Sequence, residues 1–542
     1  MAGEKPFDTV ADILAGRKTG QAVRLRGWVH RQRASGGKLA FVVLRDGTGT
    51  VQCTVKGGVV KDEESLQQAL RAKLEASVGE LDGDVVADAR APGGFEVKVT
   101  KFRLHEPGGA ASGDFPLRGE QGTEFELDKR HLWLRSTELS AIFRIKHRLY
   151  KAIRDFYDGE GFTEVDPSVI TTNACEGGST LFTFDYFGQT AYLSQSAQMY
   201  LEGMIFGLPK VYCITPSFRA EKSRTTKHLT EFHHLEAEAA WWDAEENRKH
   251  QEKLVTYLAH TIAKECEVDL KLLGQDPKRL LAVKAPFERM DYSAAIKGLQ
   301  RQGFKIEHGE DFGVPHEKAL TEGKTSPIFI CDWPAKIKAF YMAEKPGTDR
   351  VLCSDMLAPD GFGEIIGGSQ RSEDAESMTR RLWLLQWVQL AENAAGQISR
   401  WPHASALHNA APTDPMKWLS SLPQSKVEAT LREFWALSGH NDQLLLSDDE
   451  STWLLMLSGN TIASLSRISG APDKVWRQTF IEKFLIEPVL GPYEWYFDLR
   501  RYGSVPHSGF GLGIERLLRW FTGQEHIRDM LPYPRTPGRA SP

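Results

Sequence analysis

The sequence predicts an α+β protein with a small β-barrel, a larger antiparallel sheet flanked by helices, and a helical insertion. Its 542 residues suggest roughly three or four domains of about 150 residues each. Short segments of alternating apolar residues fill the first 105 residues, whereas residues 137–371 mix helical spacing with short apolar strands. The mixture lacks the regular alternation of a doubly wound sheet. A Trp-rich stretch at 378–488 then separates two parts that resemble one domain.

The composition is that of a globular protein. With 41% hydrophobic and 26% charged residues, long disorder and collagen-like repeats are excluded. No run of 18 apolar residues occurs, so no membrane span is expected. The first 20 residues lack the apolar core of a secretory signal. The six cysteines are dispersed without a C-x-x-C motif, which favours a reducing, cytoplasmic location.

The N-terminal region is basic and alternates like β-strands. Residues 21–60 contain seven Lys and Arg and one acid, a local charge of +6, although the whole chain carries −5. Strands are expected at 23–29, 51–55, 84–89 and 95–102, with turns at 36–37 and 46–47. A basic barrel face with an aromatic such as Phe41 suits single-stranded nucleic acid. A solvated basic edge around a core Phe is the alternative.

A segment rich in Gly and Pro, 105–122, marks a domain boundary. It is followed by apolar residues at helical spacing from 137 to 157, and by a helix stop at 159–161. We therefore expect domains at 1–107 and at 131–377 with 489–542, a linker at 108–130 and the insertion at 378–488.

Two segments carry residues suited to phosphate and purine binding. Arg219 and Phe232 fall on two expected strands joined by a polar loop. An Arg can bind a phosphate bidentately, and a Phe can stack on a purine. Near the C-terminus, residues 509–516 (GFGLGIER) predict a strand that enters a helix at Arg516. No P-loop motif occurs, so phosphates would be held by these side chains.

Taken together, these segments resemble the class II aminoacyl-tRNA synthetases, in the subgroup with an N-terminal anticodon-binding OB-fold. Residues 161–167 (GFTEVDP) resemble motif 1, FRAE through HLTEF (218–232) resembles motif 2, and GFGLGIER resembles motif 3. Their order covers about four fifths of the chain. The resemblance implies ATP as substrate, Mg²⁺, and a homodimer formed through motif 1, which contains Pro167.

The resemblance also implies roles for single residues. Arg219 would hold the α-phosphate, and Phe232 would stack on adenine with Glu221 near its amino group. His228 and Arg516 would reach the γ-phosphate. Glu364 would bind Mg²⁺, with Asp355 as second candidate, since carboxylate oxygens suit this cation.

Within the subgroup the pocket is similar to that of the asparagine-specific enzymes. Aspartate enzymes place a Lys where this chain has Leu201, and an Asp where it has Glu236. An acceptor at Glu236 and a donor at Arg371 suit an amide, whereas Glu236 repels a carboxylate. Glu176 would take the α-ammonium group. Gln198 and Tyr341 would line the same pocket.

The implied reaction is the ligation of L-asparagine to tRNA(Asn) through an asparaginyl-adenylate. In the barrel, Phe41 and Gln52 fall where the family stacks on and hydrogen-bonds the central anticodon uridine. His30 and Arg31 would contact neighbouring bases. The family also places a strand at the PYEWY segment, 492–496.

The insertion at 378–488 contains seven of the fourteen tryptophans. We expect a helical subdomain whose aromatic residues form its own core. A surface that contacts a partner or a second subunit is the alternative, and an editing site is not expected because no catalytic cluster stands out.

Three other functions stay open on the sequence. The chain could be an aspartyl enzyme that also charges tRNA(Asn), although Leu201 and Glu236 oppose this. It could form the amide of free aspartate, although relatives with that activity lack the barrel. It could be an inactive RNA-binding paralogue, although Arg219, Glu364 and Arg516 are all present.

Overall fold

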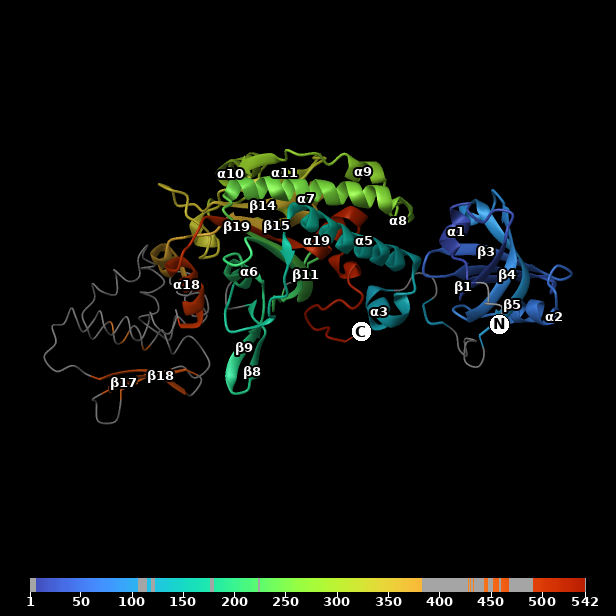
Figure 1. Cartoon of the computed structure of the whole chain (residues 1–542), viewed down its shortest axis with the longest axis horizontal. Coiled ribbons are helices and arrows are strands. Elements are labelled where there is room, and N and C mark those ends of the chain that lie inside the picture. Colours follow the sequence, from blue (N-terminus) through green and yellow to red (C-terminus); the bar gives the residue numbers. More distant parts are fainter. Residues whose placement is uncertain are drawn as a thin grey trace. The chain divides into compact units, whose positions relative to one another are not determined.

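The computed structural model describes residues 6–105, 115–117, 122–175, 180–222, 225–382, 427, 429, 432, 443–446, 452–457, 460–466 and 491–541. The chain divides into two compact units, Met1–Ser140 together with Pro542, and Ala141–Ser541 (Figure 1). In the described residues no helix is both long and apolar enough to cross a membrane. All six cysteines are free thiols. The finer domain division expected from the sequence stays a prediction.

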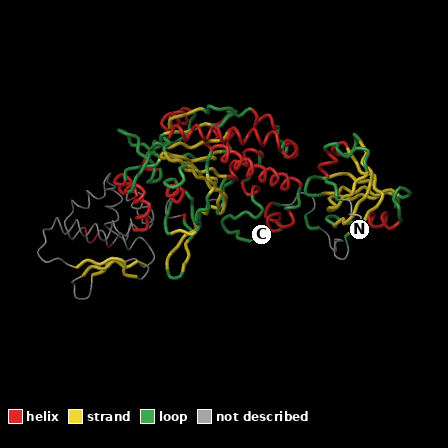
Figure 2. Tube along the Cα trace, viewed as in Figure 1, coloured by secondary structure: helices red, strands yellow, loops and turns green. Residues whose placement is uncertain are grey.

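The first unit contains the expected barrel. Its strands close in the order β1-β2-β3-β5-β4 (Figure 2). The alternating apolar residues of the first three strands all point into one core, because successive side chains of a strand face opposite sides. The strands are β1 (Ala22–Ser35), β2 (Leu39–Arg45), β3 (Thr50–Lys56), β4 (Ser77–Ala87) and β5 (Phe95–Leu104). The helical elements of this unit are α1 (Val10–Leu14), α2 (Glu63–Arg71), η1 (Pro92–Gly94), α3 (Thr123–Asp128) and α4 (Arg130–Trp133).

Strand β4 begins earlier than its apolar pattern predicts. The expected start was residue 84, and the observed start is Ser77. Two β-bulges, next to Val78 and Gly83, break the alternation that sequence analysis relies on. Gly83 allows a close approach, since a Cβ there would lie 2.5 Å from the Lys98 carbonyl oxygen.

The second unit is organised around an eight-stranded sheet in the order β12-β13-β14-β15-β19-β11-β10-β6. The strands from β13 to β10 pair antiparallel, as expected, whereas β12 and β6 add parallel edges. Their bounds are β6 (Thr163–Glu164), β10 (Lys210–Phe218), β11 (Glu231–Ala240), β12 (Glu288–Asp291), β13 (Ile328–Cys331), β14 (Cys353–Ala358), β15 (Gly363–Gln370) and β19 (His507–Gly513). A small sheet combines β7 (Ile170–Thr171), β9 (Gln189–Leu193) and β8 (Thr183–Tyr186).

Helices flank the large sheet. The predicted helix after the linker is α5 (Thr137–Glu160). It lies beside α7 (Ala244–Glu265), and the rings of Phe156 and Tyr157 contact His250 of α7 (Figure 1). The other helical elements are α6 (Gln198–Met204), α8 (Glu267–Leu272), α9 (Pro277–Leu281), α10 (Tyr292–Arg301), α11 (Val314–Thr321), α18 (Glu494–Arg501), α19 (Ile514–Thr522), η3 (Ala335–Ile337), η4 (Pro359–Gly361), η7 (Gly491–Tyr493) and η8 (Ile527–Met530).

Buried ion pairs fix α5 and α19 to the sheet. Lys146 of α5 donates to Glu515 of α19 over 2.7 Å, and the His233 backbone N–H of β11 donates to the same carboxylate over 2.9 Å. Burial acts to raise the pKa of Glu515, but the hydrogen bond from His233 and the charge of Lys146 outweigh it and lower the pKa to about 2. The carboxylate next to Arg516 is therefore ionised and fixed.

Two expectations for the C-terminal half are corrected. The PYEWY segment is not a strand but a helical turn followed by α18. Tyr493, Tyr496, Phe497 and Arg500 are buried at the i, i+3, i+4, i+7 spacing of one helix face.

The insertion is not wholly helical either. Its described part contains an antiparallel sheet of β16 (Gln443–Leu446), β17 (Thr452–Leu457) and β18 (Asn460–Ser466).

Candidate active site

A cavity of about 610 Å³ opens on the large sheet of the second unit. Strands β11, β14, β15 and β19 supply its floor, and residues from 336 to 342 supply one wall. All described residues that the sequence predicted for ATP, amino-acid and metal binding line it. They are Gln198, Arg219, Glu221, His228, Phe232, Glu236, Tyr341, Asp355, Glu364, Arg371 and Arg516. Glu176 lies outside the described residues.

Arg219 and Phe232 meet across the β10–β11 hairpin. The Arg219 guanidinium carbon lies 5.4 Å from the centroid of the Phe232 ring. Strand pairing places Phe232 opposite Ser217, next to the end of β10. The ring of His234, two residues along the same face of β11, packs edge-on against Phe232 at 4.8 Å. This arrangement presents an aromatic face and a cation to one part of the cavity.

The histidines of this region are neutral at neutral pH. Burial lowers the pKa of His234 to about 3, with the charge of Arg219 acting in the same direction. Burial and the charge of Arg516 also lower the pKa of His228. His228 contacts Thr225, and its Nε2 lies 3.8 Å from a carboxylate oxygen of Glu221. A neutral imidazole beside Arg516 avoids repulsion between two cations.

Glu364 and Asp355 form a pair of carboxylates on neighbouring strands. A Cβ on Gly367 would lie 3.2 Å from Glu364 Oε1 and 3.7 Å from Asp355 Oδ1, so both groups border one small space above this glycine. Arg516 Nη1 lies 3.3 Å from Glu364, and Lys338 Nζ lies 2.6 Å from Asp355. Burial raises the pKa of Asp355 to about 7, partly opposed by the Lys338 charge. Two carboxylates flanked by cations match a site for a divalent cation with phosphates.

Glu236 is held at the start of α6. The Ser196 hydroxyl and the Ala197 backbone N–H, the latter over 2.8 Å, both donate to its carboxylate. The Gln198 backbone N–H in turn donates to Ser196 Oγ over 3.2 Å. Leu201, at the position where aspartate enzymes carry a Lys, is buried in an apolar cluster instead. This part of the cavity therefore presents an acceptor at Glu236 and no cation from α6.

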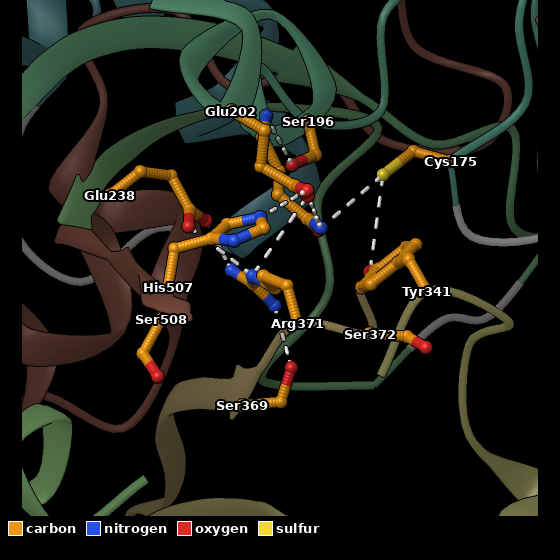
Figure 3. Close-up of polar contacts among 12 residues, drawn as sticks. Cys175, Ser196, Glu202, Glu238, Tyr341, Ser369, Arg371, Ser372, His507 and Ser508 are labelled. Atoms are coloured by element: carbon orange, nitrogen blue, oxygen red, sulfur yellow. Dashed lines mark hydrogen bonds and ion pairs between the residues drawn. The ribbon is translucent and has the colours of Figure 1, made fainter. Parts of the chain in front are cut away.

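Arg371 follows β15 and is almost completely buried. Its Nε donates to Glu238 over 3.3 Å, its Nη2 contacts the same carboxylate, and its Nη1 donates to Ser369 Oγ over 2.7 Å (Figure 3). A guanidinium has five N–H groups, and these contacts use three of them. Burial raises the pKa of Glu238 to about 7, with the Arg371 charge opposing this shift. Arg371 therefore lines the cavity with a guanidinium that is fixed in direction.

Tyr341 and Gln198 approach each other through Cys175. The Cys175 sulfur lies 3.9 Å from the Tyr341 hydroxyl and 3.8 Å from Gln198 Oε1 (Figure 3). Cys175 directly precedes the predicted Glu176. The contact places Cys175 beside the part of the cavity that Gln198 and Tyr341 line.

Sequence reasoning missed several lining residues. Lys227, His234, Asp311, Lys336 and Lys338 all border the cavity. Lys336 and Lys338 lie shortly before Tyr341, and Lys227 precedes His228, so closeness to predicted site residues was the available signal. Lys227 is paired with the buried Glu317 over 2.6 Å, a contact from a helix far along the chain that no local pattern reveals.

The predicted RNA-contacting residues lie in the first unit. Strand pairing sets Arg33 opposite Phe41, and Gln52 opposite Val43, while the alternate residues Val42 and Cys53 point into the core. Phe41 and Gln52 therefore share the outer face of β2 and β3. Arg33 covers the Phe41 ring at 5.4 Å, and Arg31 is exposed. His30 falls at a β-bulge and is half-buried. Pro167 follows the edge strand β6 in the second unit.

Comparisons with known proteins identify the family to which this chain belongs. The family model "tRNA synthetases class II (D, K and N)" matches residues 122–397 and 468–537, and "OB-fold nucleic acid binding domain" matches 23–104. The chain therefore belongs to the class II tRNA synthetases for aspartate, lysine and asparagine. The gap in the match, 398–467, falls inside the expected insertion.

Relatives that match nearly the whole chain are asparagine–tRNA ligases. The enzyme of Thermoplasma acidophilum is 36% identical over 98% of this chain and 100% of its own length, and that of Thermococcus kodakarensis is 39% identical over 96% of both. The Pyrococcus horikoshii asparaginyl-tRNA synthetase complexed with asparaginyl-adenylate has a TM-score of 0.73 at 38% identity, covering 97% of both chains. The Entamoeba histolytica enzyme with the same adenylate has 0.68 at 27% identity, covering 96% of this chain and 97% of its own.

The glycines of motif 3 have different roles. Gly511 and Gly513 line the cavity. Gly509 instead lets β19 pack on β11, because a Cβ there would lie 2.1 Å from Glu238 Cδ and 2.4 Å from the Ala237 carbonyl oxygen. We expect Gly509→Ala to lower the free energy of unfolding by about 1–3 kcal/mol or more, as overpacking does, in urea unfolding followed by circular dichroism.

The matched control is Gly511→Ala on the same strand. Its Cβ would meet only the Glu236 side chain, at 3.7 Å, which is ordinary van der Waals contact. Equal unfolding midpoints for the two variants would contradict the assigned role of Gly509.

Proposed function

We propose that this chain joins L-asparagine to tRNA(Asn) in two steps at the described cavity. In the first step a carboxylate oxygen of asparagine forms a bond to the α-phosphorus of ATP, and the bond to the departing diphosphate breaks. In the second step a ribose hydroxyl of the tRNA terminus attacks the mixed anhydride, and AMP leaves. The observation that carries this proposal is the joint placement of Arg219, Phe232 and Arg516 with Glu236 and Arg371 in one cavity.

Alignment and charge neutralisation supply the catalysis. Arg219 would contact the α-phosphate, where negative charge grows during attack, and Phe232 would stack on adenine with Glu221 near its amino group. His228 and Arg516 would contact the γ-phosphate. No protein base is required, because the nucleophile is a carboxylate that is already ionised. The site then acts by orientation and electrostatic stabilisation.

Mg²⁺ fits the space between Glu364 and Asp355. Within the described residues no group of three or more His, Cys, Asp and Glu side chains gathers as a metal cage. A pair of carboxylates nevertheless suits this cation, which usually takes one or two carboxylates together with substrate phosphates. When bound, the ion neutralises phosphate charge. Lys338 pairs with Asp355 and Arg516 pairs with Glu364, so each carboxylate already has one cation beside it.

Amide recognition follows from the two fixed partners of the pocket. Glu236, held by Ser196 and Ala197, would accept from the side-chain NH₂ group directly or through water. Arg371 would donate to the side-chain oxygen. Gln198, Tyr341 and Glu176 would complete the pocket, with Glu176 on the α-ammonium group. The carboxylate of aspartate would face Glu236 and be repelled.

The barrel would bind the anticodon, with Phe41 stacked on the central uridine, Gln52 bonded to it, and His30 and Arg31 on neighbouring bases. We also propose a homodimer through motif 1, where the exposed edge strand β6 and Pro167 lie. A cytoplasmic location accords with translation and with the six free thiols.

The direct test is ATP–diphosphate exchange with asparagine and, separately, aspartate. We expect kcat/KM for asparagine to exceed that for aspartate at least about a hundredfold, because a buried polar site rejects a mismatched isostere strongly. Arg219→Ala should reduce exchange with unchanged circular dichroism. Faster exchange with aspartate than with asparagine would contradict the roles proposed for Glu236 and Arg371 in amide recognition. Absence of exchange with both amino acids would contradict the proposed function.

A second test concerns the barrel. We expect Phe41→Ala to lower kcat/KM for tRNA about tenfold to a hundredfold, since base–aromatic stacking contributes about 1–3 kcal/mol per base. Diphosphate exchange without tRNA should stay unchanged. The matched control is Phe7→Ala. The Phe7 ring likewise lies under guanidinium groups, those of Arg24 and Arg26 at 4.7 and 4.6 Å, but it belongs to the start of the chain and not to strand β2. Equal tRNA charging by both variants would remove Phe41 from the anticodon site.

A third test uses pH. The pKa of His228 lies below its ordinary value, so the free enzyme carries a neutral imidazole at neutral pH, and a γ-phosphate would favour its protonation. ATP binding should then take up a proton, and the KM for ATP should rise with pH through the neutral range. His228→Asn should flatten this rise. Parallel KM profiles for both proteins would show that His228 does not meet the phosphate.

A further inference from the structure

Glu202 of α6 is the centre of a buried polar cluster behind the amino-acid side of the cavity. Its side chain has no solvent exposure and accepts four hydrogen bonds. The donors are Gln198 Nε2 at 2.7 Å, the Tyr496 hydroxyl at 2.7 Å, Arg500 Nη2 at 2.6 Å and His507 Nε2 at 3.0 Å. Arg371 Nε lies 3.9 Å away (Figure 3).

Glu202 is linked to the cavity without lining it. Gln198 and Arg371 line the cavity, whereas Tyr496, Arg500 and His507 do not. The carboxylate therefore joins two groups that would face the substrate to the helix α18 and the strand β19. It can act on the substrate only through these partners, as a positioning residue.

The ring of His507 joins Glu202 to the start of β19. Its Nδ1 lies 2.7 Å from the Val505 carbonyl oxygen, and its Nε2 lies 3.0 Å from the Glu202 carboxylate. These two contacts hold the ring, and with it the carboxylate, in one place.

The charges of the cluster nearly cancel. Arg371 and Arg500 are cations, and Glu202 and Glu238 are acids. Glu236, also at this side of the cavity, adds one more acid. Burial acts to raise the pKa of Glu202, but the charge of Arg500 and the bond from His507 outweigh it, so this pKa lies well below its usual range. Glu202 is thus the anion that balances these cations at every pH near neutral.

We propose that Glu202 determines the choice between amide and carboxylate, by balancing the cations behind Arg371 so that the pocket has no surplus positive charge to pair with a carboxylate. This inference rests on the proposed function and deepens it. Without the Glu202 anion the cluster becomes more positive by one charge, whatever proton Glu238 carries. A neutral amide gains nothing from that surplus, but the carboxylate of aspartate does, because a buried charge needs a compensating partner.

The experiment uses asparagine-dependent diphosphate exchange and measures two constants, the KM for asparagine and the inhibition constant of aspartate. It is carried out at about pH 8, where the carboxyl of Glu238, with its pKa of about 7, is mostly ionised. Glu202→Gln keeps the shape of the side chain. We expect the ratio of the aspartate inhibition constant to the asparagine KM to fall about tenfold or more. Glu202→Asp keeps the charge and should retain most of the wild-type ratio.

Arg500→Met gives an independent test with the opposite sign. Removing this cation makes the cluster more negative, so the same ratio should rise. The matched control is Asp269→Asn, which breaks a 2.6 Å ion pair with Arg144 in the same unit, away from the cavity, and should leave the ratio unchanged.

The outcomes distinguish a failure of this inference from a failure of the proposed function. If the KM and the inhibition constant change together in Glu202→Gln and in Arg500→Met, so that the ratio stays constant, Glu202 supports only the structure and the inference is wrong. If Glu202→Gln does not fold, the sign of the change in Arg500→Met decides. Absence of asparagine exchange in the wild-type protein would instead overturn the proposed function.

Discussion

The register of β11 between β10 and β19 is the constraint on which the site depends. Cys213 pairs with Glu236 on one side, and Gly511 pairs with Glu236 on the other. Because side chains alternate along a strand, Phe232, His234 and Glu236 all face the cavity. A slip of one residue would turn Phe232 and Glu236, the proposed adenine platform and the proposed amide acceptor, to the other face together. Gly509 secures this register by allowing β19 to approach β11 closely.

The same register brings Glu238 under Arg371 and so connects the strand to the charge cluster. Along β11 the cavity changes character from an aromatic end at Phe232, proposed for ATP, to a carboxylate at Glu236, proposed for the amide, with an ion pair at Glu238. The ion pair is buried, so its energetic cost is repaid only when every lone pair and proton is satisfied. Ser369 accepts one further N–H of Arg371, and the Glu202 carboxylate lies 3.9 Å from Arg371 Nε. The Arg371–Glu238 pair is therefore one part of a larger polar network.

Much of this arrangement could be predicted from the sequence, and the rest could not for physical reasons. Period-2 alternation predicted β1 and β3, and helical spacing predicted α5, because these patterns report burial directly. The PYEWY segment was assigned to a strand by family likeness, although its buried residues have helical spacing. Glu202 and Arg500 gave no local signal, since their partner lies 298 residues away in sequence. Contacts at such separation depend on tertiary packing alone.

The start of the insertion and the helix that follows it are both tied to residues around the pocket. Near the start of the insertion, Arg381 donates to the backbone carbonyl oxygens of Ala335, Lys338 and Ala339, over 2.9 to 3.2 Å, and so fixes the wall that carries Lys338 and Tyr341. After it, Arg500 of α18 binds Glu202. Backbone carbonyls and a buried carboxylate hold these cations in place whatever chain lies between them. The pocket thus has the same fixed walls on both sides of a long insertion, which explains how the family site tolerates one here.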